Sequence, residues 1–366
     1  MPLSYRLNGS VNQPALTRRV WITVRDAIKS LKLDNVTADL DLSLIDNLHG
    51  FKSLEIINCP QVYNLKISPH CDLHTLEISN SERLASRIDL SQHSLFGSLV
   101  MTGGFADANI RQLKTIAEMG DGDGFRNQIW EIVIADCRSP LLANIDFFSG
   151  FSRLNRLEVV NCDALRTIRS SERFKELRRI RVIDCDSLSE LSNCKTMPKL
   201  ESFAIDFCDQ LSDISEVAEM SPLRHFSFEK NLAITDISPL LKLPLHKSAH
   251  LRLIFDLDSQ ISEWLDRPEA AEISELYLGG ISSGATLRKI RLTESLKNLT
   301  LVDSESIRDL KFLLDDRQTN YLDSLTLIGC PNLRDISQLK QLRVRKLEIL
   351  DCPLISESQI AEVLEK

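Results

Sequence analysis

The sequence predicts an α/β repeat solenoid, a curved arc with a parallel inner sheet and with loops or short helices outside. Two observations predict this fold class. A short pattern of leucine-type residues recurs along nearly the whole chain, and a small sulfur-bearing or polar residue returns at one fixed place within it. The composition agrees, because 43% of the 366 residues are hydrophobic and 26% are charged, as in a globular protein with a large core.

The repeated pattern reads L-x-x-L-x-L-x-x-(C/N/S)-x-x-L, and it defines fourteen units. Its second leucine position, called the aligned position, is occupied by Leu31, Leu54, Leu76, Leu99, Ile132, Leu157, Ile180, Phe203, Phe226, Leu251, Leu276, Leu299, Leu325 and Leu347. The intervals average about 24 residues, inside the range of roughly 20 to 29 that is typical of leucine-rich repeats. Only the interval from Leu99 to Ile132 is much longer, which indicates an insertion.

Along nearly its whole length the chain resembles leucine-rich-repeat proteins. Its C-x-x-L units, such as NCDALRTI at residues 161–168, are similar to the repeats of plant intracellular immune receptors and of F-box-associated proteins. The D-I-S segments at 213–215, 236–238 and 335–337 resemble bacterial internalin-type repeats. The resemblance implies that the chain offers a preformed surface to a macromolecular partner.

Each x-L-x-L segment is expected to form a short parallel strand whose two leucine-type side chains point into the core. One unit cannot bury its apolar side alone, so stability must come from stacking on neighbours. Five residues after the aligned position stand Cys59, Cys137, Cys162, Cys185, Cys208, Cys330 and Cys352, or Ser81, Asn231 and Ser304. A small side chain there can point inward and bond the backbone of neighbouring turns, so we expect a structural ladder rather than a metal or redox site.

Both ends of the chain depart from the pattern. Residues 1–27 show no repeat match, but RRVWITV alternates and includes Trp21, so this segment is expected to cap the first open edge. The solenoid is predicted over 28–355. The segment 356–366 is predicted to form a C-terminal capping helix, with one apolar face made by Ile360, Val363 and Leu364.

The long interval holds an insertion near residues 103–128. A helical stripe closed by Gly120 is formed by Ile110, Leu113, Ile116 and Ala117. The stripe predicts a longer helix on the convex side with a surface loop, and the alternative is a protrusion that contacts a partner. DGDG at 121–124 resembles a calcium loop, but Phe125 stands where an oxygen ligand is needed, so no calcium site is predicted.

The composition and motifs argue against several classes of protein. A net charge of -8 disfavours general affinity for nucleic acid or anionic lipid. No window of about 18 residues is apolar enough for a membrane helix, and the N-terminus lacks the apolar core of a signal peptide, so a cytoplasmic or otherwise intracellular location is expected. The nine cysteines include no C-x-x-C pair, so neither a disulfide framework nor a zinc finger is predicted.

No enzyme motif stands in a suitable context. GISSG at 280–284 matches G-x-S-x-G, but no histidine follows Ser282, since the last one is His250. The sequence also has no P-loop, no H-E-x-x-H motif and no glycine fingerprint for a dinucleotide. The chain is therefore predicted to be no enzyme and to need neither a metal nor a cofactor.

The strand register predicts a binding surface. Residues one before, one after and three after the aligned position should point to the inner face. The column three after the aligned position is rich in aliphatic residues. One explanation is that these residues form a partner-binding face. The other is that β-branched residues suit strands and are partly shielded by the curved sheet. The candidate partner-binding residues are Arg156, Glu158, Arg179, Arg181, Asp206, His225, Glu229, His250, Arg252 and Tyr277. Arginine and tyrosine are favoured interface anchors, whereas the alternative is a set of cross-strand ion pairs on a solvated face.

The sequence thus favours a non-enzymatic scaffold that binds a protein partner through its concave face, or through the insertion. One alternative is a sensing, adaptor or effector component of an immune-type or ubiquitin-type assembly whose other domains are on separate chains. Another is an enzyme on a repeat scaffold. The sequence leaves the oligomeric state and the identity of the partner open.

Overall fold

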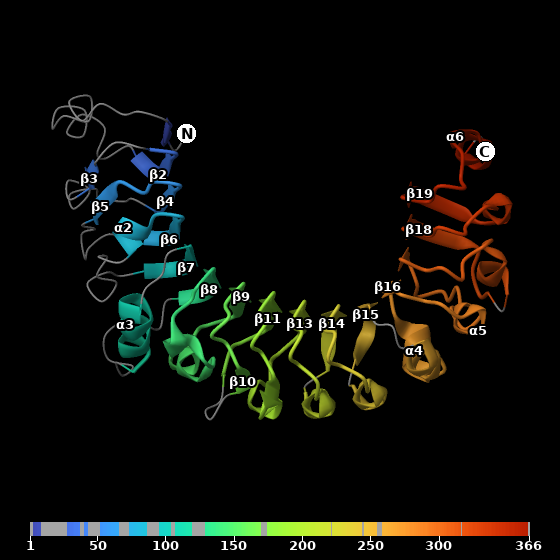
Figure 1. Cartoon of the computed structure of the whole chain (residues 1–366), viewed down its shortest axis with the longest axis horizontal. Coiled ribbons are helices and arrows are strands. Elements are labelled where there is room, and N and C mark those ends of the chain that lie inside the picture. Colours follow the sequence, from blue (N-terminus) through green and yellow to red (C-terminus); the bar gives the residue numbers. More distant parts are fainter. Residues whose placement is uncertain are drawn as a thin grey trace. The chain divides into compact units, whose positions relative to one another are not determined.

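A computed structural model describes residues 3–8, 28–36, 40–42, 52–65, 73–85, 95–103, 107–118, 129–169, 174–220, 222–243, 245–254, 258–315 and 317–364. The chain divides into two compact units, Met1–Lys199 and Leu200–Lys366, called unit 1 and unit 2. Each unit is an α/β repeat solenoid built on an open parallel sheet, which confirms the predicted fold class (Figure 1). The prediction of a single solenoid domain over 28–355 stays a prediction.

Unit 1 carries one strand of its main sheet in each repeat. In spatial order these strands are β1 (Leu3–Asn8), β2 (Ile28–Asp34), β4 (Ser53–Ile57), β6 (Leu73–Ser79), β7 (Leu95–Thr102), β8 (Ile129–Ala135), β9 (Arg156–Val160) and β11 (Arg179–Ile183). The chain returns between them through the strand pairs β3 (Leu40–Leu42) with β5 (Val62–Leu65) and β10 (Thr167–Arg169) with β12 (Glu190–Ser192), and through α2 (Glu82–Ala85), α3 (Asp107–Glu118), η4 (Pro140–Leu142), η5 (Asp146–Gly150) and η6 (Cys194–Thr196). These connecting segments lie on one side of the main sheet (Figure 1), and we call that side of each unit's sheet the returning side.

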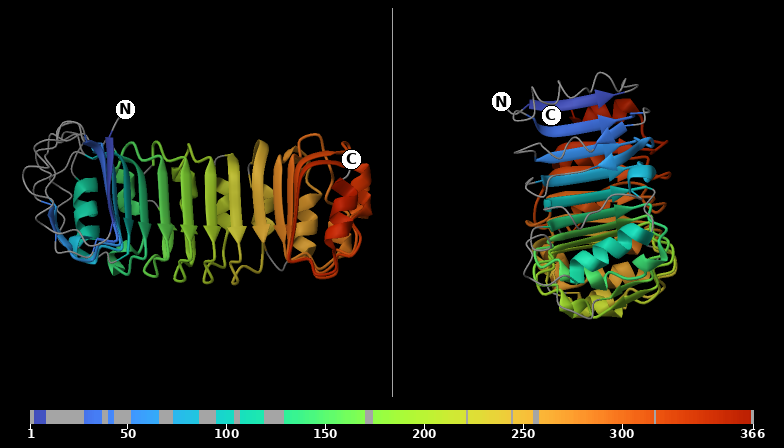
Figure 2. Two further views of the ribbon diagram at one scale, coloured as in Figure 1. Left: turned by 90° about the horizontal axis from the view of Figure 1, so that it is seen from above. Right: turned by 90° about the vertical axis from the view of Figure 1, so that its left-hand side faces the viewer.

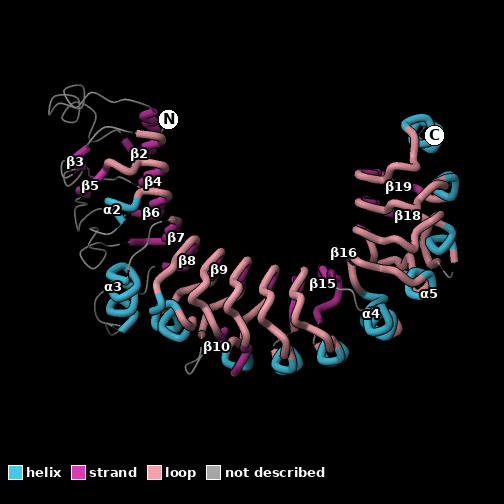
Figure 3. The backbone as a smooth tube through the Cα atoms, in the orientation of Figure 1, coloured by secondary structure: helices cyan, strands magenta, loops and turns pink. Residues whose placement is uncertain are grey.

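Unit 2 has the same construction. Its strands, in spatial order, are β13 (Ser202–Asp206), β14 (Leu223–Glu229), β15 (Leu245–Ile254), β16 (Glu275–Gly279), β17 (Asn298–Val302), β18 (Tyr321–Ile328) and β19 (Arg343–Leu350). The returning side holds η7 (Ser215–Glu219), η8 (Ser238–Lys242), α4 (Asp258–Leu265), η9 (Pro268–Glu272), α5 (Gly284–Leu287), η10 (Lys311–Leu314), η11 (Ser337–Gln341) and α6 (Glu357–Leu364). Figures 2 and 3 show the strands of each unit side by side, with the helical segments on one side of them.

The strand register follows the leucine spacing. Within each unit the aligned residue of one strand lies opposite the aligned residue of the next, as for Leu54 with Leu76 and for Leu276 with Leu299. The repeat pattern did not predict β1, which pairs in parallel with β2 and places Tyr5 opposite Leu31. The remaining part of the expected N-terminal cap, including Trp21, lies outside the described residues.

The core consists of the inward side chains of the stacked strands. The aligned residue and the residue two positions after it are buried in nearly every described repeat, and Leu157 and Val159 are an example. In unit 2 the core includes an aromatic cluster of Phe203, Phe226 and Phe228, whose ring centroids lie 4.7 to 6.3 Å apart. Stacking of this kind buries an apolar side that one repeat alone would leave open.

The ladder residues are buried and bonded to the backbone as predicted. Cys162 Sγ lies 3.2 Å from the carbonyl oxygen of Val160 in its own repeat and 3.8 Å from that of Ile134 in the preceding repeat. All eight cysteines in the described part of the chain are buried, and none of them forms a disulfide. Burial raises the pKa of the Cys59 thiol and raises that of Cys330 to about 12, so both stay protonated at neutral pH.

The residue just before each ladder position has a left-handed backbone. Its φ is 51° at Asn58, 48° at Asn161 and 61° at Gly329. Each strand turns sharply inward there, and asparagine, aspartate and glycine adopt this conformation with the least strain. Phe207 and Lys230 of unit 2 occupy the same place, with φ of 58° and 50°, and lack that advantage.

The insertion forms the predicted helix on the returning side of unit 1. In α3 the side chains of Ile110 and Leu113 are fully buried, and the helix packs against η5. A Cβ atom added at Gly150, which ends η5, would lie 2.3 Å from the backbone oxygen of Ala117, so glycine permits this close approach. Gly120 and the DGDG segment at 121–124 lie outside the described residues. The C-terminal helix forms as α6, where Val363 is buried.

Candidate protein-binding face

The side of each sheet opposite the returning side is called the strand face. It is built by three side chains per repeat, at the positions that the register predicted. The expected column of exposed aliphatic residues is only partly present, since Ile57 and Val160 are half-buried, whereas Ile254 and Val302 are buried. Parallel strands lie about 4.8 Å apart, so side chains at the same position of neighbouring strands contact each other and reduce each other's exposure to solvent. The prediction of exposure is therefore wrong for Ile254 and Val302, and Leu350 of the last strand is exposed.

In unit 1 the structure brings together four candidate residues on neighbouring strands. On β9 and β11, Arg179 lies opposite Arg156, and Arg181 lies opposite Glu158. The two oxygens of Glu158 bind different arginines, Arg156 at 2.8 Å and Arg181 at 3.2 Å. Because Glu158 is buried and both of its oxygens are engaged, it holds two guanidinium groups in fixed positions.

The ion-pair network of unit 1 contains two residues that were not among the candidates predicted from the sequence. Arg156 also binds Glu131 on β8 at 2.8 Å, and the other oxygen of Glu131 accepts a hydrogen bond of 2.6 Å from Ser98 Oγ. Both residues stand directly before an aligned position, so the outward columns could have identified them. Arg179 is exposed and forms no ion pair with the described residues of unit 1.

In unit 2 two acidic candidates lie side by side at the ends of β13 and β14. Asp206 is opposite Glu229 in the sheet, and both are buried. Asp206 accepts hydrogen bonds from Ser227 Oγ at 2.7 Å and from the backbone N–H of Glu229 at 3.1 Å. Glu229 binds Arg252 at 2.5 Å, and the Arg252 guanidinium stacks over the Tyr277 ring at 4.1 Å from its centroid. The arginine is thus fixed by a carboxylate and by an aromatic face.

The two histidine candidates are also neighbours. The rings of His225 and His250 meet edge to face, with centroids 4.5 Å apart, and His250 Nδ1 lies 3.0 Å from a carboxylate oxygen of Glu275. Both histidines line a shallow depression of about 190 Å³ in the strand face, together with Arg252 and Tyr277. Glu275 belongs to the same outward column as the histidines, but it was not among the candidates predicted from the sequence.

The buried carboxyl of Glu229 is expected to make the stability of the fold depend on pH. Burial raises the pKa of the Glu229 carboxyl, Arg252 opposes this shift, and the neighbouring Asp206 adds to it. Because the folded state holds the proton more tightly, the contribution of Glu229 to stability is greatest below its unfolded pKa, about 4.3, and is lost as pH rises through the folded pKa.

We therefore expect Glu229→Gln to remove this dependence. Urea unfolding of the two proteins from about pH 4 to about pH 7 should show the wild type losing free energy of unfolding relative to the variant as pH rises. Parallel curves for the two proteins would show that Glu229 titrates alike in the folded and unfolded chains.

Two features of the described residues bear on metal binding and on the serine motif. In the described part of the chain, no group of three or more histidine, cysteine, aspartate or glutamate residues is placed to hold a metal ion. The GISSG segment leads into α5, where Ser283 Oγ accepts a hydrogen bond of 3.1 Å from the N–H of Ala285. Ser283 is thus a helix N-cap, which is a structural role, whereas the serine at the nucleophile position of the motif is its neighbour Ser282.

Comparison with known proteins adds no function. No protein-family model matches the sequence, and no curated protein matches it. No helix formed by the described residues is long and apolar enough to cross a membrane.

Proposed function

We propose that this chain is a non-enzymatic leucine-rich-repeat protein that binds a protein partner through its strand face. One observation carries the proposal. Arginine side chains on this face are held in place by buried carboxylates, as Arg156 and Arg181 are by Glu158 and Arg252 is by Glu229, and the Arg252 guanidinium lies over the Tyr277 ring. Arginine and tyrosine are the side chains that most often anchor protein interfaces.

Preorganisation is the physical advantage of this arrangement. A free arginine on a surface loses side-chain entropy when a partner fixes it, about 0.5–1.5 kcal/mol for each immobilised side chain. Arg156 and Arg252 have already lost this freedom in the unbound protein, because each is bonded on a rigid strand. Partner binding through them then costs less ordering.

The charge of the face in unit 1 indicates the chemistry of the partner. Arg179 and Arg181 are exposed at the end of the network, and Arg181 is 48% exposed at its side chain although it binds Glu158. Guanidinium groups bind carboxylates in a bidentate geometry. A partner surface with acidic side chains therefore fits this part of the strand face.

The C-x-x-L units support a second, more specific proposal for the same binding role. Their resemblance to immune-receptor and F-box-associated repeats favours a sensing, adaptor or effector component of an immune-type or ubiquitin-type assembly, with the other domains on separate chains. In that case the partner would belong to such an assembly, and its identity would decide between the two readings.

The experiment is an affinity capture from extracts of the source cells with three baits, quantified by mass spectrometry. The wild type is compared with Arg179→Glu/Arg181→Glu and with a matched control, Arg166→Glu/Arg169→Glu. The control makes the same charge change at exposed residues of unit 1, and Arg169 lies in β10 on the returning side (Figure 1).

We expect at least one protein to be recovered with the wild type and the control at about ten times the level seen with the strand-face variant. Equal recovery with all three baits would exclude these two arginines as the binding site. Loss with both variants would mean that net charge, rather than the strand face, determines the capture.

A further inference from the structure

The last repeat of unit 2 is less well covered than the repeats before it. In β13 to β18 the two inward side chains of each strand are buried, but in β19 the corresponding Leu347 and Ile349 are only half-buried. Leu350 and Leu354 are 51% and 55% exposed, respectively. An apolar surface is therefore left open at this end of the unit.

The helix α6 covers the returning side of this repeat and leaves the strand edge open. Lys340 of η11 forms an ion pair with Glu362 of α6, and Gln359 donates a hydrogen bond of 3.0 Å to the carbonyl oxygen of Arg334. Among the described residues β19 pairs only with β18, so the backbone groups on its other edge have no strand beside them.

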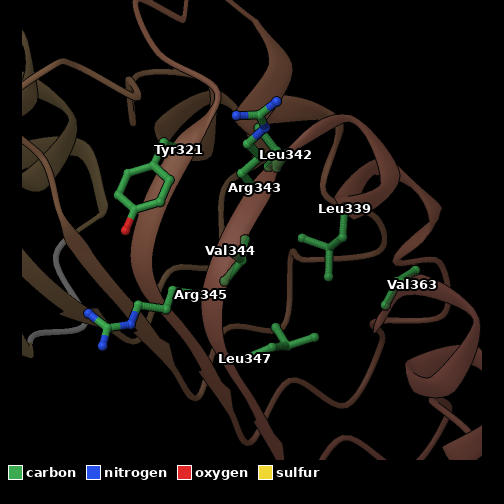
Figure 4. A pocket seen from close by; sticks show the side chains of 8 residues that line it. All are labelled: Tyr321, Leu339, Leu342, Arg343, Val344, Arg345, Leu347 and Val363. Atoms are coloured by element: carbon green, nitrogen blue, oxygen red, sulfur yellow. The ribbon is translucent and has the colours of Figure 1, made fainter. Parts of the chain in front are cut away.

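A pocket of about 270 Å³ opens beside this edge (Figure 4). The side chains of Leu339, Val344, Leu347 and Val363 surround it, while the guanidinium groups of Arg343 and Arg345 extend away from it (Figure 4). The pocket is thus the apolar end of the core of the last repeat. An unpaired edge beside an open apolar core is a template for pairing with another strand.

We propose that a second copy of this chain occupies this edge, with the two β19 strands pairing antiparallel across a two-fold axis at Leu347. The two-fold arrangement presents the same patch of both copies, as in most homodimers. Each open core end, with its Leu347 and pocket, would be covered by the same surface of the other copy.

The charges on β19 favour this register over those centred one residue to either side. With the axis at Leu347, Lys346 of each copy lies opposite Glu348 of the other, on the strand face. An axis at Lys346 or at Glu348 would place like charges opposite each other, which is destabilising. An axis between two residues would place an inward side chain opposite an outward one, because side chains alternate along a strand. Within one copy Lys346 and Glu348 form an ion pair at 2.8 Å, so both face the same side.

A charge-swap experiment with the full chain tests the proposal, using sedimentation equilibrium from about 1 to about 200 µM. A one-strand interface is small, so we expect a wild-type dissociation constant on the order of 1–100 µM. Lys346→Glu should weaken self-association at least tenfold, since the new glutamate faces Glu348 of the second copy, and Glu348→Lys should do the same. The doubly changed Lys346→Glu/Glu348→Lys protein should dimerise within about threefold of the wild type.

A mixture supplies a further check. Equimolar Lys346→Glu and Glu348→Lys proteins should form a heterodimer, because the four charges are then complementary. Circular dichroism melting will show whether each variant is folded, and both positions are outward-facing. A wild type that is monomeric up to about 200 µM would overturn the proposal and would favour the reading that the charges on β19 protect an open edge. Single variants that dimerise like the wild type would overturn it too.

Discussion

Replacing Cys162 by lysine is expected to lower the free energy of unfolding by about 3–5 kcal/mol. The thiol is fully buried between two repeats and lies against the carbonyl oxygens of Val160 and Ile134. A lysine side chain is far longer, and its ammonium group would be taken out of water at a place where Cys162 is bonded to backbone oxygens and to none of the described carboxylates. Urea unfolding followed by circular dichroism measures the loss.

Cys162→Ser is the matched control. The chain itself carries serine at the ladder positions Ser81 and Ser304, where the hydroxyl donates to a backbone carbonyl at 3.0 Å. We therefore expect the serine variant to lose only about 1 kcal/mol. A lysine variant that unfolds at the same urea concentration as the serine variant would contradict a buried ladder.

The second large effect is expected for Asn231→Asp in unit 2. The Asn231 side-chain amide donates a hydrogen bond of 2.8 Å to the Ile205 carbonyl oxygen, and its oxygen accepts one of 2.8 Å from the Cys208 N–H. An ionised carboxylate would still accept the hydrogen bond from the Cys208 N–H, but its other oxygen would face the Ile205 carbonyl oxygen and be repelled by it. We expect a loss of about 3–5 kcal/mol at neutral pH.

The loss should shrink in acid, which separates it from a change in packing. A protonated aspartic acid can donate to Ile205, so burial and this bond raise its folded pKa above the unfolded value of about 3.9. The penalty is therefore small near pH 4 and grows as pH rises. Asn231→Cys, which restores the commonest ladder residue, is the matched control and should show a small loss that does not change with pH over this range. A loss for Asn231→Asp that is independent of pH would contradict the assignment of the two hydrogen bonds.

The fold could be predicted from the sequence because the leucine-type residues of each repeat are the ones that are buried. A strand has two inward positions per repeat, and the leucine spacing placed them correctly, as for Leu54 opposite Leu76. The ladder was also predictable, since one small residue type returned at one place. In contrast, β1 belongs to a segment without a repeat match, and its pairing with β2 is a tertiary contact that local pattern does not encode.

The candidate site was predictable only as a set of positions. The outward columns located Arg156 and Arg252 on the strand face, but the choice of partners depends on side-chain rotamers and on which neighbour is closer. Ser98, Glu131 and Glu275 therefore joined the networks without having been selected. The left-handed backbone before each ladder residue could have been predicted from the asparagine, aspartate and glycine residues found there. Phe207 stands at the same place in its repeat and breaks this pattern, so the pattern is harder to recognise.

The measurement that tests the central claim most directly is the dissociation constant of the captured partner for three proteins, the wild type, Arg179→Glu/Arg181→Glu and Arg166→Glu/Arg169→Glu. Binding through the strand face predicts that the first double variant binds at least about 100-fold more weakly, while the second stays within about twofold of the wild type. Unchanged affinity for the strand-face variant, with all three proteins equally stable in urea, would contradict the account and place the binding surface elsewhere.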